Sequence, residues 1–402
     1  MNLLARGAGG LGALLLAAAT VATFKSTQAA QLGAPGVGMQ VVETKQRLAE
    51  KVQSNVAPAP LPPAAPGGVL AVNAYKNVQV LGHLSSGDFT RLMTAMTLWV
   101  APNEGCGYCH AHQKDANGKD VLEDGVPQAD LNRMDSDELY TKRVGRRMLQ
   151  MTLRLNGDWK QHVKETGVTC YTCHRGNPVP ANIWFDVPEQ EQHGLLGNRA
   201  GQNAPSDVAG LSSLPESSLR PYLAGEEEIR VQSTVAIGSD NRASIKQTEW
   251  SYSLMIHMSK SLGVNCTFCH NSRSMGSWET SPATRSQAWF GIRMVRELNR
   301  DFLEPLTSTF PKQRLGPTGD GPKANCATCH QGAYKPLLGA SMLKDYPVLA
   351  EAKPQPPKTS AIEATPAKTE PTAAANENAD AGSDAGLAAP TGVDASVPPK
   401  KP

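Results

Sequence analysis

The chain of 402 residues carries a formal net charge of +2 at pH 7, only 5% aromatic residues, 36 glycines and 30 prolines. A charge this close to zero gives no sign of a nucleic-acid partner, which would need a strongly basic surface. The length would accommodate roughly two or three domains of ordinary size. Both ends are low in complexity, so we expect the folded part to be shorter than the chain.

Residues 1–30 are typical of an export segment. Arg6 supplies a positive charge, residues 7–24 are uncharged and mostly apolar, and residues 27–29 (Thr-Gln-Ala) resemble a small-x-small cleavage site. A helix over this apolar run would span roughly 27 Å, close to a bilayer core of about 30 Å. Two interpretations stay open, a signal peptide that is removed and a transmembrane anchor that is retained.

Residues 31–71 are rich in proline and alanine, which favours a linker or an extended surface arm. Residues 72–180 then carry the first two motifs described below. A helix is expected over 88–100, and a second helix is expected to begin near Ser136. This part of the chain therefore predicts helical units that each lead into a motif.

Residues 181–245 show little periodicity and predict an irregular connecting segment between two halves of the chain. Residues 246–350 return to the earlier pattern, with helices expected from Gln247 and over 282–302. The tail 351–402 is rich in Ala, Pro, Lys and Asp and is expected to be disordered.

One pattern, C-x-x-C-H, occurs four times in the chain and is the attachment signature of c-type haem. The two thiols form thioether bonds to the porphyrin vinyl groups, and the adjacent histidine becomes an axial ligand of the iron. The expected attachment residues are Cys106, Cys109, Cys170, Cys173, Cys266, Cys269, Cys326 and Cys329. The expected axial residues are His110, His174, His270 and His330.

A C-x-x-C pair can also be half of a zinc site or a thioredoxin-like redox pair. The count argues against both, because all eight cysteines lie in the four motifs and each pair is followed at once by histidine. We therefore predict a tetrahaem cytochrome c with four covalently bound haem c groups. Covalent haem attachment takes place outside the bacterial cytoplasmic membrane, so the protein is expected to be exported.

The spacing of the motifs suggests an internal duplication. The motif histidines are 64, 96 and 60 residues apart, a short, long, short pattern. Residues 92–96 resemble 254–258, and residues 145–148 resemble 291–294. The expected fold is mainly α-helical with much irregular loop, in two pseudo-symmetric halves that each carry two helix–turn–motif units.

A haem that only transfers electrons usually has both axial positions filled, by methionine or a second histidine. Met-x-x-Met precedes three of the motifs, and both members of such a pair lie on one helix face, so at most one binds iron. Methionines at this spacing also fill core gaps, and spacing does not choose between the members. The pairs are Met93 and Met96, Met148 and Met151, and Met255 and Met258.

Five histidines lie outside the motifs. His112 is too close to its own motif to turn back onto that iron, and His83 and His193 lie in expected loops. His162 and His257 remain candidate ligands. Mixed methionine and histidine ligation would give haems of different potential, which suits stepwise electron transfer and does not suit an enzyme that needs an open iron position.

Several runs resemble the tetrahaem cytochrome subunit of the purple-bacterial photosynthetic reaction centre. They are 167–176, 265–271, 289–296, 335–340 and 343–347, and the resemblance covers about residues 75–350. It implies a mainly helical electron-transfer subunit on the periplasmic face of the photosynthetic inner membrane. The expected partners are the reaction-centre L and M subunits with the bacteriochlorophyll special pair. A soluble cytochrome c or a high-potential iron–sulfur protein is the expected electron donor.

The resemblance also implies the distal ligands, three methionines and one histidine. Carried onto this sequence, they pair Met93 with His110, Met148 with His174, Met255 with His270, and His162 with His330. Duplication alone would instead favour Met294 for the fourth haem, by analogy with Met148.

Many members of that family carry a lipidated cysteine near the mature N-terminus. Here every cysteine belongs to a haem motif, so we expect a retained helix over 7–24 to anchor the protein. Residues 103–138 hold nine acidic and three basic side chains, which could attract a basic cytochrome c or could form an ordinary solvated loop.

Two other classes stay open on the sequence alone. A multihaem reductase would need a haem that lacks a distal ligand. A quinol-oxidising cytochrome would not associate with a photosynthetic core.

Overall fold

A computed structural model of the chain describes residues 26–32, 39–188, 208–210, 214, 218–229 and 245–351. Within these residues the chain is mainly helical with much loop, which confirms that part of the expected fold class. The apolar run 7–24 and the tail beyond residue 351 lie outside the described residues. In the described ranges, no helix combines the length and apolar character that a membrane crossing requires.

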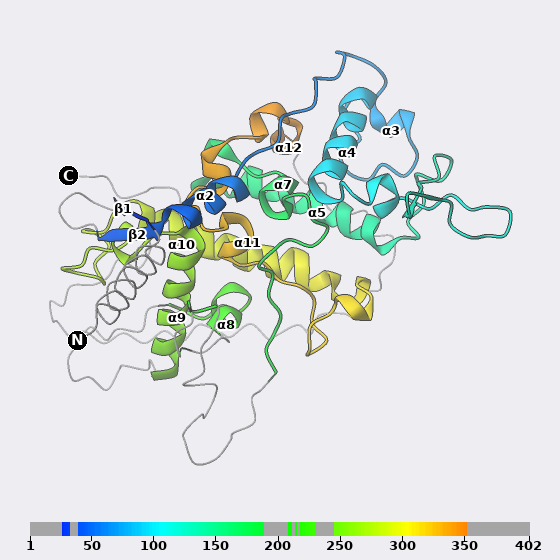
Figure 1. Cartoon of the computed structure of the whole chain (residues 1–402). Helices are drawn as coiled ribbons and strands as arrows, with labels where there is room; N and C mark the ends of the chain where they lie inside the picture. Colours follow the sequence, from blue (N-terminus) through cyan, green and yellow to red (C-terminus); the bar gives the residue numbers. More distant parts are fainter. Residues whose placement is uncertain are drawn as a thin grey trace, which may run out of the picture. The chain divides into compact units, whose positions relative to one another are not determined.

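Figure 1 shows the helices and the antiparallel hairpin of β1 with β2, and a second small antiparallel hairpin pairs β3 with β4. The strands are β1 (Thr27–Gln31), β2 (Gln40–Thr44), β3 (Leu122–Glu123) and β4 (Val126–Pro127). The helices are α2 (Lys45–Ser54), α3 (Ala71–Ala74), α4 (Ser86–Val100), α5 (Tyr140–Asp158), α6 (Lys160–Val163), α7 (Cys170–His174), α8 (Leu219–Leu223), α9 (Ile245–Leu262), α10 (Thr284–Glu297), α11 (Cys326–His330) and α12 (Val348–Glu351). The 3-10 turns include η1 (Gly105–Tyr108), η5 (Cys266–Phe268) and η9 (Pro336–Gly339), and a π-helical turn, η6 (Leu298–Leu303), continues α10.

Local sequence explains where α4 begins and which face it buries. Ser85 caps the helix, because its side-chain oxygen accepts a hydrogen bond from the Asp88 backbone N–H at 3.0 Å. Leu92, Ala95 and Trp99 are buried, and their spacing of three and four residues places them on one face. The helix expected over 88–100 is therefore present and begins two residues earlier.

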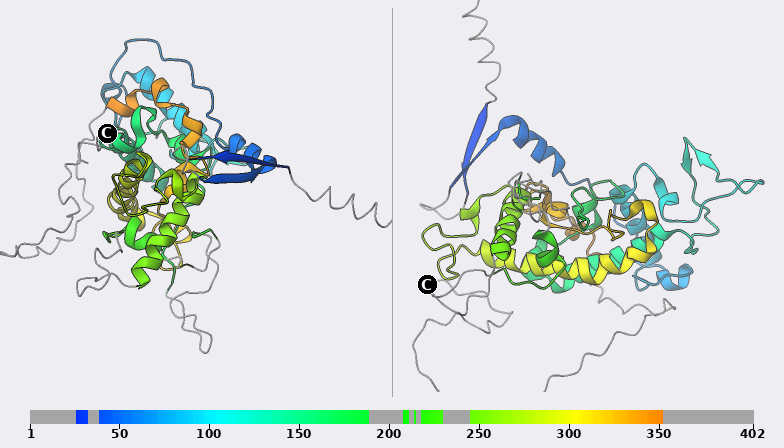
Figure 2. Two further views of the ribbon diagram at one scale, coloured as in Figure 1. Left: turned by 90° about the vertical axis from the view of Figure 1, so that its left-hand side faces the viewer. Right: turned by 90° about the horizontal axis from the view of Figure 1, so that it is seen from below.

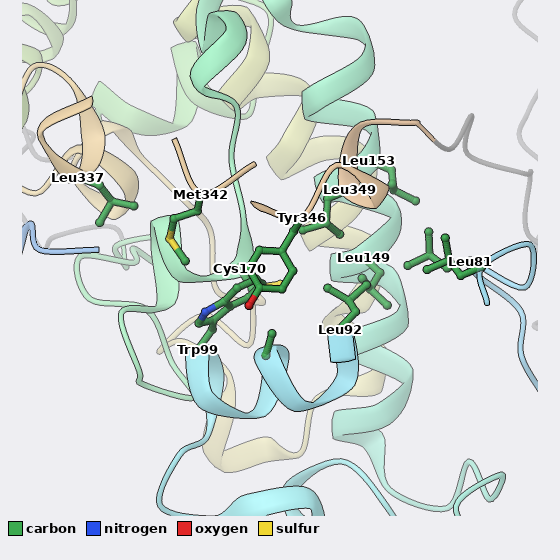
Figure 3. Close-up of a cluster of buried hydrophobic side chains, with 12 residues drawn as sticks. Leu81, Leu92, Trp99, Leu149, Leu153, Cys170, Leu337, Met342, Tyr346 and Leu349 are labelled. Carbon is green, nitrogen blue, oxygen red and sulfur yellow. The ribbon is translucent and has the colours of Figure 1, made fainter. Parts of the chain in front are cut away.

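The apolar face of α4 packs in a core cluster with α5, α7 and the segment that leads into α12. Figure 3 shows Trp99, Cys170 and Tyr346 meeting between these elements. The ring centroids of Trp99 and Tyr346 lie 4.7 Å apart in an edge-to-face arrangement, a contact worth about 0.5–1.5 kcal/mol beyond its buried area. The cluster therefore joins the end of the described chain to the first two motif units.

A second core cluster joins α8, α9 and α10. Tyr222 of α8 is fully buried, and its hydroxyl lies 2.8 Å from the Ser251 hydroxyl of α9. The stretch 181–245, which was expected to be irregular, thus contains a helical turn that anchors the second pair of motif units. The other described residues of that stretch form turns and extended chain.

Residues 31–71 differ from the expected linker. The hairpin pairs Thr27 with Thr44, and the chain then continues directly into α2, as the dark-blue segment of Figure 2 shows. Thr44 caps α2, because its hydroxyl oxygen accepts from the Arg47 backbone N–H at 3.2 Å. Only the residues between α2 and α3 form the extended arm that the Pro/Ala-rich composition predicts.

The end of α2 is fixed to the fourth motif unit through Asn55, which is 1% exposed. Its side-chain amide donates to the Gln331 carbonyl at 3.4 Å, and its side-chain oxygen accepts from the Leu337 backbone N–H at 3.2 Å. These contacts span more than half of the chain, which is why local composition gave no sign of them.

Candidate haem-binding sites

A cavity of about 1270 Å³ is lined by residues of all four C-x-x-C-H motifs. Its wall is predominantly apolar, as the porphyrin face requires. The motif cysteines and histidines in the wall are Cys106, Cys109, His110, Cys170, Cys173, His174, Cys269, Cys326, Cys329 and His330. Cys266 and His270 of the third motif do not line this cavity, although Cys269 of the same motif does.

Contacts among the motif units follow the order first, second, fourth, third. The Gly176 backbone N–H, just after the second motif, donates to the Trp99 carbonyl of α4 at 2.9 Å. The Arg175 guanidinium, directly after the second motif, donates to the Cys329 carbonyl at 3.2 Å, which joins the second motif to the fourth.

The fourth unit then meets the third through backbone and aromatic contacts. The Gly332 backbone N–H donates to the Ser261 carbonyl at 2.8 Å. The rings of Phe268 and Tyr334 have centroids 5.4 Å apart. The four motifs therefore form one continuous series in space although the chain visits them in a different order.

The second and fourth motifs each fold as a single helical turn, α7 and α11. At the start of the turn of the second motif, the hydroxyl oxygen of Thr172 accepts a hydrogen bond from the Thr169 backbone N–H at 3.0 Å. The turn of the fourth motif begins in the same way, with Thr328 accepting from the Asn325 backbone N–H at 3.0 Å. Both turns thus satisfy backbone groups that a short helix leaves unpaired.

The same two turns end in left-handed residues, Arg175 with φ 51° and Gln331 with φ 45°. Because the chain reverses here, the carbonyl of the residue three positions after the motif histidine points back to that histidine. His174 donates through Nδ1 to the Asn177 carbonyl, and His330 donates to the Ala333 carbonyl, both at 2.9 Å.

The first and third motifs fold as 3-10 turns, η1 and η5, and find their carbonyl partners elsewhere. His110 donates through Nδ1 to the Met134 carbonyl at 2.9 Å, across 24 residues. His270 donates to the Met275 carbonyl at 2.9 Å.

The helix that follows each of these two motifs also holds the motif turn. The Thr141 hydroxyl, at the start of α5, donates to the Tyr108 carbonyl at 2.5 Å. The Thr284 hydroxyl, at the start of α10, donates to the Phe268 carbonyl. Both acceptors are the residue before the second cysteine of a motif, so the two helices perform the same task.

All four motif histidines therefore share one arrangement, with Nδ1 donating to a backbone carbonyl. Such a bond fixes the tautomer and the orientation of the ring and leaves Nε2 as the metal-binding atom. Burial, with a smaller contribution from His162, lowers the pKa of His330 to about 4. The imidazole is thus neutral, which is the form that binds iron.

The motif thiols lie in mostly apolar surroundings that raise the pKa of five of them, whereas the Cys173 thiol and the Arg175 charge lower the pKa of Cys329. Burial raises the pKa of Cys170 and of Cys326 to about 12, and that of Cys109 to about 11. Across the described ranges, no group of three histidine, cysteine or acidic side chains converges on a metal position. Neutral thiols beside an apolar cavity fit thioether attachment of haem.

Met93 and Met96 both line the cavity, as do Met148 and Met151. The first methionine of each pair has a threonine one turn later. The Thr97 hydroxyl donates to the Met93 carbonyl at 3.1 Å, and the Thr152 hydroxyl donates to the Met148 carbonyl at 2.9 Å. Met93 and Met148 thus occupy equivalent helical positions.

The third unit differs, because Met258 lines the cavity and Met255 does not. Both methionines pack against the core cluster of α8, α9 and α10. His257, between them, is 4% exposed, and its Nε2 lies 3.3 Å from the Ser261 hydroxyl. Burial lowers the pKa of His257 to about 4. His257 is therefore a buried neutral histidine of the core and does not line the cavity.

His162 lies opposite the fourth motif. Its ring centroid is 6.0 Å from that of His330. Two metal–imidazole bonds of about 2 Å and two ring radii require roughly this separation. His162 donates through Nδ1 to the Gln287 carbonyl at 2.8 Å, which leaves Nε2 free to face His330.

Helix α10 makes room for the His162 ring at Gly291. A Cβ at that position would lie 2.5 Å from Cε1 of His162, closer than any side chain allows. Met294, the ligand that duplication alone favoured, also lines the cavity but packs in the second core cluster, whereas the His162 ring faces the ring of His330. The geometry on this side therefore favours His162.

The remaining histidines have other surroundings. His83 is exposed, and His112 lies 3.0 Å from the Gly107 carbonyl and 3.1 Å from the Asp120 carboxylate. His193 lies outside the described residues.

Sequence reasoning missed the residues that hold the motifs in place, namely Thr141, Thr284, Asn55, Arg175 and Lys142. Each acts on a backbone carbonyl or an amide of another element, so no motif marks it. A signal exists only for the two threonines, since each is followed by a basic residue at the start of a helix.

The family model for the photosynthetic reaction centre cytochrome C subunit matches residues 24–350. The photosynthetic reaction center cytochrome c subunit of Rubrivivax gelatinosus is 49% identical over 338 residues, covering 84% of this chain and 87% of the relative. The subunit of Thermochromatium tepidum is 45% identical over 319 residues, covering 79% of this chain and 74% of the relative. That of Roseobacter denitrificans is 40% identical over 357 residues, covering 85% and 91%.

These matches confirm the resemblance drawn from the motif runs, and they include the segments that hold all four motifs. They also exclude the reductase class, because the family consists of electron carriers. The chain therefore belongs to the family of photosynthetic reaction centre cytochrome c subunits and is an electron-transfer protein of the reaction centre rather than an enzyme.

Proposed function

We propose that the protein carries four haem c groups, one on each motif, with His110, His174, His270 and His330 as proximal ligands. The observation that carries this proposal is the arrangement common to all four histidines, each with Nδ1 donating to a carbonyl. Covalent haem supplies the reversible one-electron chemistry, and the protein holds and orients each iron through its side chains.

For the distal positions we propose Met93, Met148 and Met255 for the first three haems, and His162 for the fourth. The separation of the His162 and His330 rings supports the fourth assignment most directly. The threonine bonds common to Met93 and Met148 support their equivalence. Met255 rests on the family resemblance, with Met258 as the alternative because it lines the cavity.

The proposed duplication has support in the way the motifs fold. The first and third motifs share a 3-10 turn held by a threonine of the next helix, and the second and fourth share a capped helical turn. Two halves, each with one turn of either kind, account for this alternation. Electrons would then pass along the spatial series of first, second, fourth and third haem.

As a reaction-centre subunit, the protein is associated with the reaction-centre complex and hence with its membrane. The finer proposal is that it sits at the periplasmic face on the L and M subunits and re-reduces the oxidised special pair. The experiment is flash-induced absorbance of the haem band in isolated membranes. Haem oxidation after each flash is expected. Full haem content by pyridine haemochrome assay without any flash response would contradict the proposal.

For the donor we propose a soluble cytochrome c or a high-potential iron–sulfur protein. Several acidic side chains of 103–138 are engaged locally, such as Asp120 with Lys114 and Asp137 with Arg146. Glu123 and Asp124, at the β3–β4 hairpin, are exposed and free to attract a basic donor. Donor oxidation should slow as salt rises, since salt screens this attraction. A rate independent of salt would exclude such steering.

For membrane attachment we propose that the helix over 7–24 is retained. Strand β1 supports this, because cleavage after Ala29 would cut the strand that pairs with β2. The intact mass of the purified subunit decides. A mass that includes residues 7–24 is expected, and a mature chain that begins near residue 30 would contradict retention.

A further inference from the structure

The carbonyl oxygen of Met134 accepts two hydrogen bonds in the first site. One comes from Nδ1 of His110 at 2.9 Å, and the other comes from the Lys142 ammonium at 2.7 Å. A carbonyl oxygen has two lone pairs, so both bonds form at once. The proximal histidine of the first haem is thereby linked through one atom to a positive charge.

The start of α5 fixes this arrangement. Thr141 binds the motif turn, and Lys142 follows directly, with a side chain that is only 13% exposed. Its ammonium also donates to the Ser136 carbonyl at 2.8 Å. The loop and the helix therefore hold the ammonium against the Met134 carbonyl.

The charge is only partly neutralised. Asp137 lies 3.5 Å from the Lys142 ammonium, and the same carboxylate accepts from the Arg146 guanidinium at 2.8 Å. The Asp137 carboxylate is thus shared between two cations, and Asp135 acts on the Lys142 ammonium only through a weaker charge interaction.

The other three sites lack this feature. In the described chain, no charged side chain donates to the carbonyls of Asn177, Met275 or Ala333, the partners of the other proximal histidines. At the third site, Arg285 donates to the carbonyls of Ser277 and Gly276 instead. The shared carbonyl is therefore specific to the first site among those described.

A carbonyl that accepts from Nδ1 increases the basicity of the imidazole, which favours ferric iron. A cation on the same oxygen draws electron density away and weakens that effect. Its charge also disfavours the extra positive charge of ferric iron, and both effects raise the reduction potential. We propose that Lys142 is a positioning residue that raises the potential of the first haem through the Met134 carbonyl.

This inference rests on the proposed attachment of a haem at the first motif with His110 as its ligand. The test is a spectroelectrochemical titration of the purified four-haem subunit and its variants. The component of the first haem is identified as the one that a Met93→His exchange displaces. Haem content, and the absorption band that ferric haem shows only with methionine ligation, are measured on the same samples.

Lys142→Met should make oxidation of the first haem about tenfold more favourable. This corresponds to a fall of about 59 mV in the reduction potential of that haem, which is a one-electron couple. Lys142→Arg keeps the positive charge, so the potential of the first haem should stay close to its wild-type value. Arg143→Met is the matched control, since Arg143 is the exposed neighbouring cation and donates to the Asp137 carbonyl rather than to Met134. Arg143→Met should change the potential of the first haem by only a small fraction of the change that Lys142→Met causes.

Asp137→Asn gives a second measurement of opposite sign, useful if Lys142→Met does not assemble. Removing the carboxylate leaves the cations uncompensated, so the potential of the first haem should rise. The inference fails if haem content and the methionine band are normal but Lys142→Met matches Arg143→Met, or if Asp137→Asn lowers the potential. If the wild-type protein itself lacks the first haem, the proposed function fails instead.

Discussion

The first and third motifs compared with the second and fourth show two ways of holding one pentapeptide. The second and fourth motifs encode their own geometry, because the cap, the left-handed end and the carbonyl partner all lie within nine consecutive residues. The first and third motifs depend on a helix further along the chain, which supplies Thr141 or Thr284.

This difference teaches where control of a haem can enter. In a self-contained turn, the partner of the histidine is set by the local backbone. In a turn held from outside, the loop between motif and helix can bring new groups to the histidine, and at the first site it brings Lys142. The arrangement of the first site therefore allows a residue outside the motif to contact the carbonyl partner of the histidine.

The largest expected effect comes from the distal ligand of the first site. Met93→Leu should abolish the methionine absorption band of one haem and lower its potential, because the sixth ligand is lost. Met96→Leu is the matched control one turn away, and it should leave the band intact. Absorption and redox titration distinguish the two variants. The opposite result, with Met96 essential and Met93 dispensable, would reverse the assignment.

A second prediction concerns two helical glycines, one beside the His162 ring and one on the exposed side of α5. Gly291→Ala on α10 would force a Cβ into the His162 ring and should destabilise the fold by about 1–3 kcal/mol. It should also produce a high-spin signal from the fourth haem in electron paramagnetic resonance, as the ring moves off the iron.

The control is Gly157→Ala on α5, an exposed position that does not line the cavity and where a Cβ would meet no atom within 4 Å. That exchange should stabilise the helix by about 0.5–1 kcal/mol and leave every haem low-spin. A low-spin fourth haem in Gly291→Ala would remove His162 from the site.

The comparison of motif turns gives a third prediction. Thr328→Val leaves the buried Asn325 backbone N–H without its partner, so it should cost about 1–3 kcal/mol. Thr284→Val removes a donor from a half-buried carbonyl that water can reach, so it should cost about 1 kcal/mol or less. Urea unfolding followed by circular dichroism measures both. If Thr328→Val and Thr284→Val lower the free energy of unfolding by the same amount, the two kinds of turn depend equally on their threonine hydrogen bonds.

The sequence predicted the parts of the site whose chemistry is local. The eight cysteines and four motif histidines follow from the pattern itself, and the structure lines one cavity with most of them. The helices before the motifs also follow from local periodicity. His162 had to come from resemblance, because no spacing rule places it 6.0 Å from a histidine 168 positions later.

The parts that could not be predicted act through the backbone over long distances. The Met134 carbonyl serves His110 across 24 residues, and any residue type can supply a carbonyl. Likewise, the proline-rich composition of 31–71 hid α2, whose end is fixed by Asn55 against the fourth motif unit. Such contacts leave no trace in periodicity or composition.

The smallest expected effect concerns the charges of the first site. Burial alone would raise the pKa of Asp137, but hydrogen bonds from Arg146 and Asn77 and the charges of Arg146 and Lys142 lower it from 3.8 to about 2. A carboxylate with a lowered pKa stabilises the fold above pH 4 and loses that contribution as the pH falls from 4 to 2. Because a third of the side chain is exposed, we expect about 1 kcal/mol at pH 7.

Asp137→Asn should therefore unfold more easily than wild type at pH 7, and the difference should vanish near pH 2. Glu138→Gln is the control, since Glu138 forms an exposed pair with Arg133 and should change stability by less than about 0.5 kcal/mol. Thermal unfolding between pH 2 and pH 7 measures both. If the stability of Asp137→Asn differs from that of wild type by the same amount across that pH range, Asp137 contributes through packing rather than through its charge. The rise in the potential of the first haem that we expect for Asp137→Asn would then have no electrostatic basis.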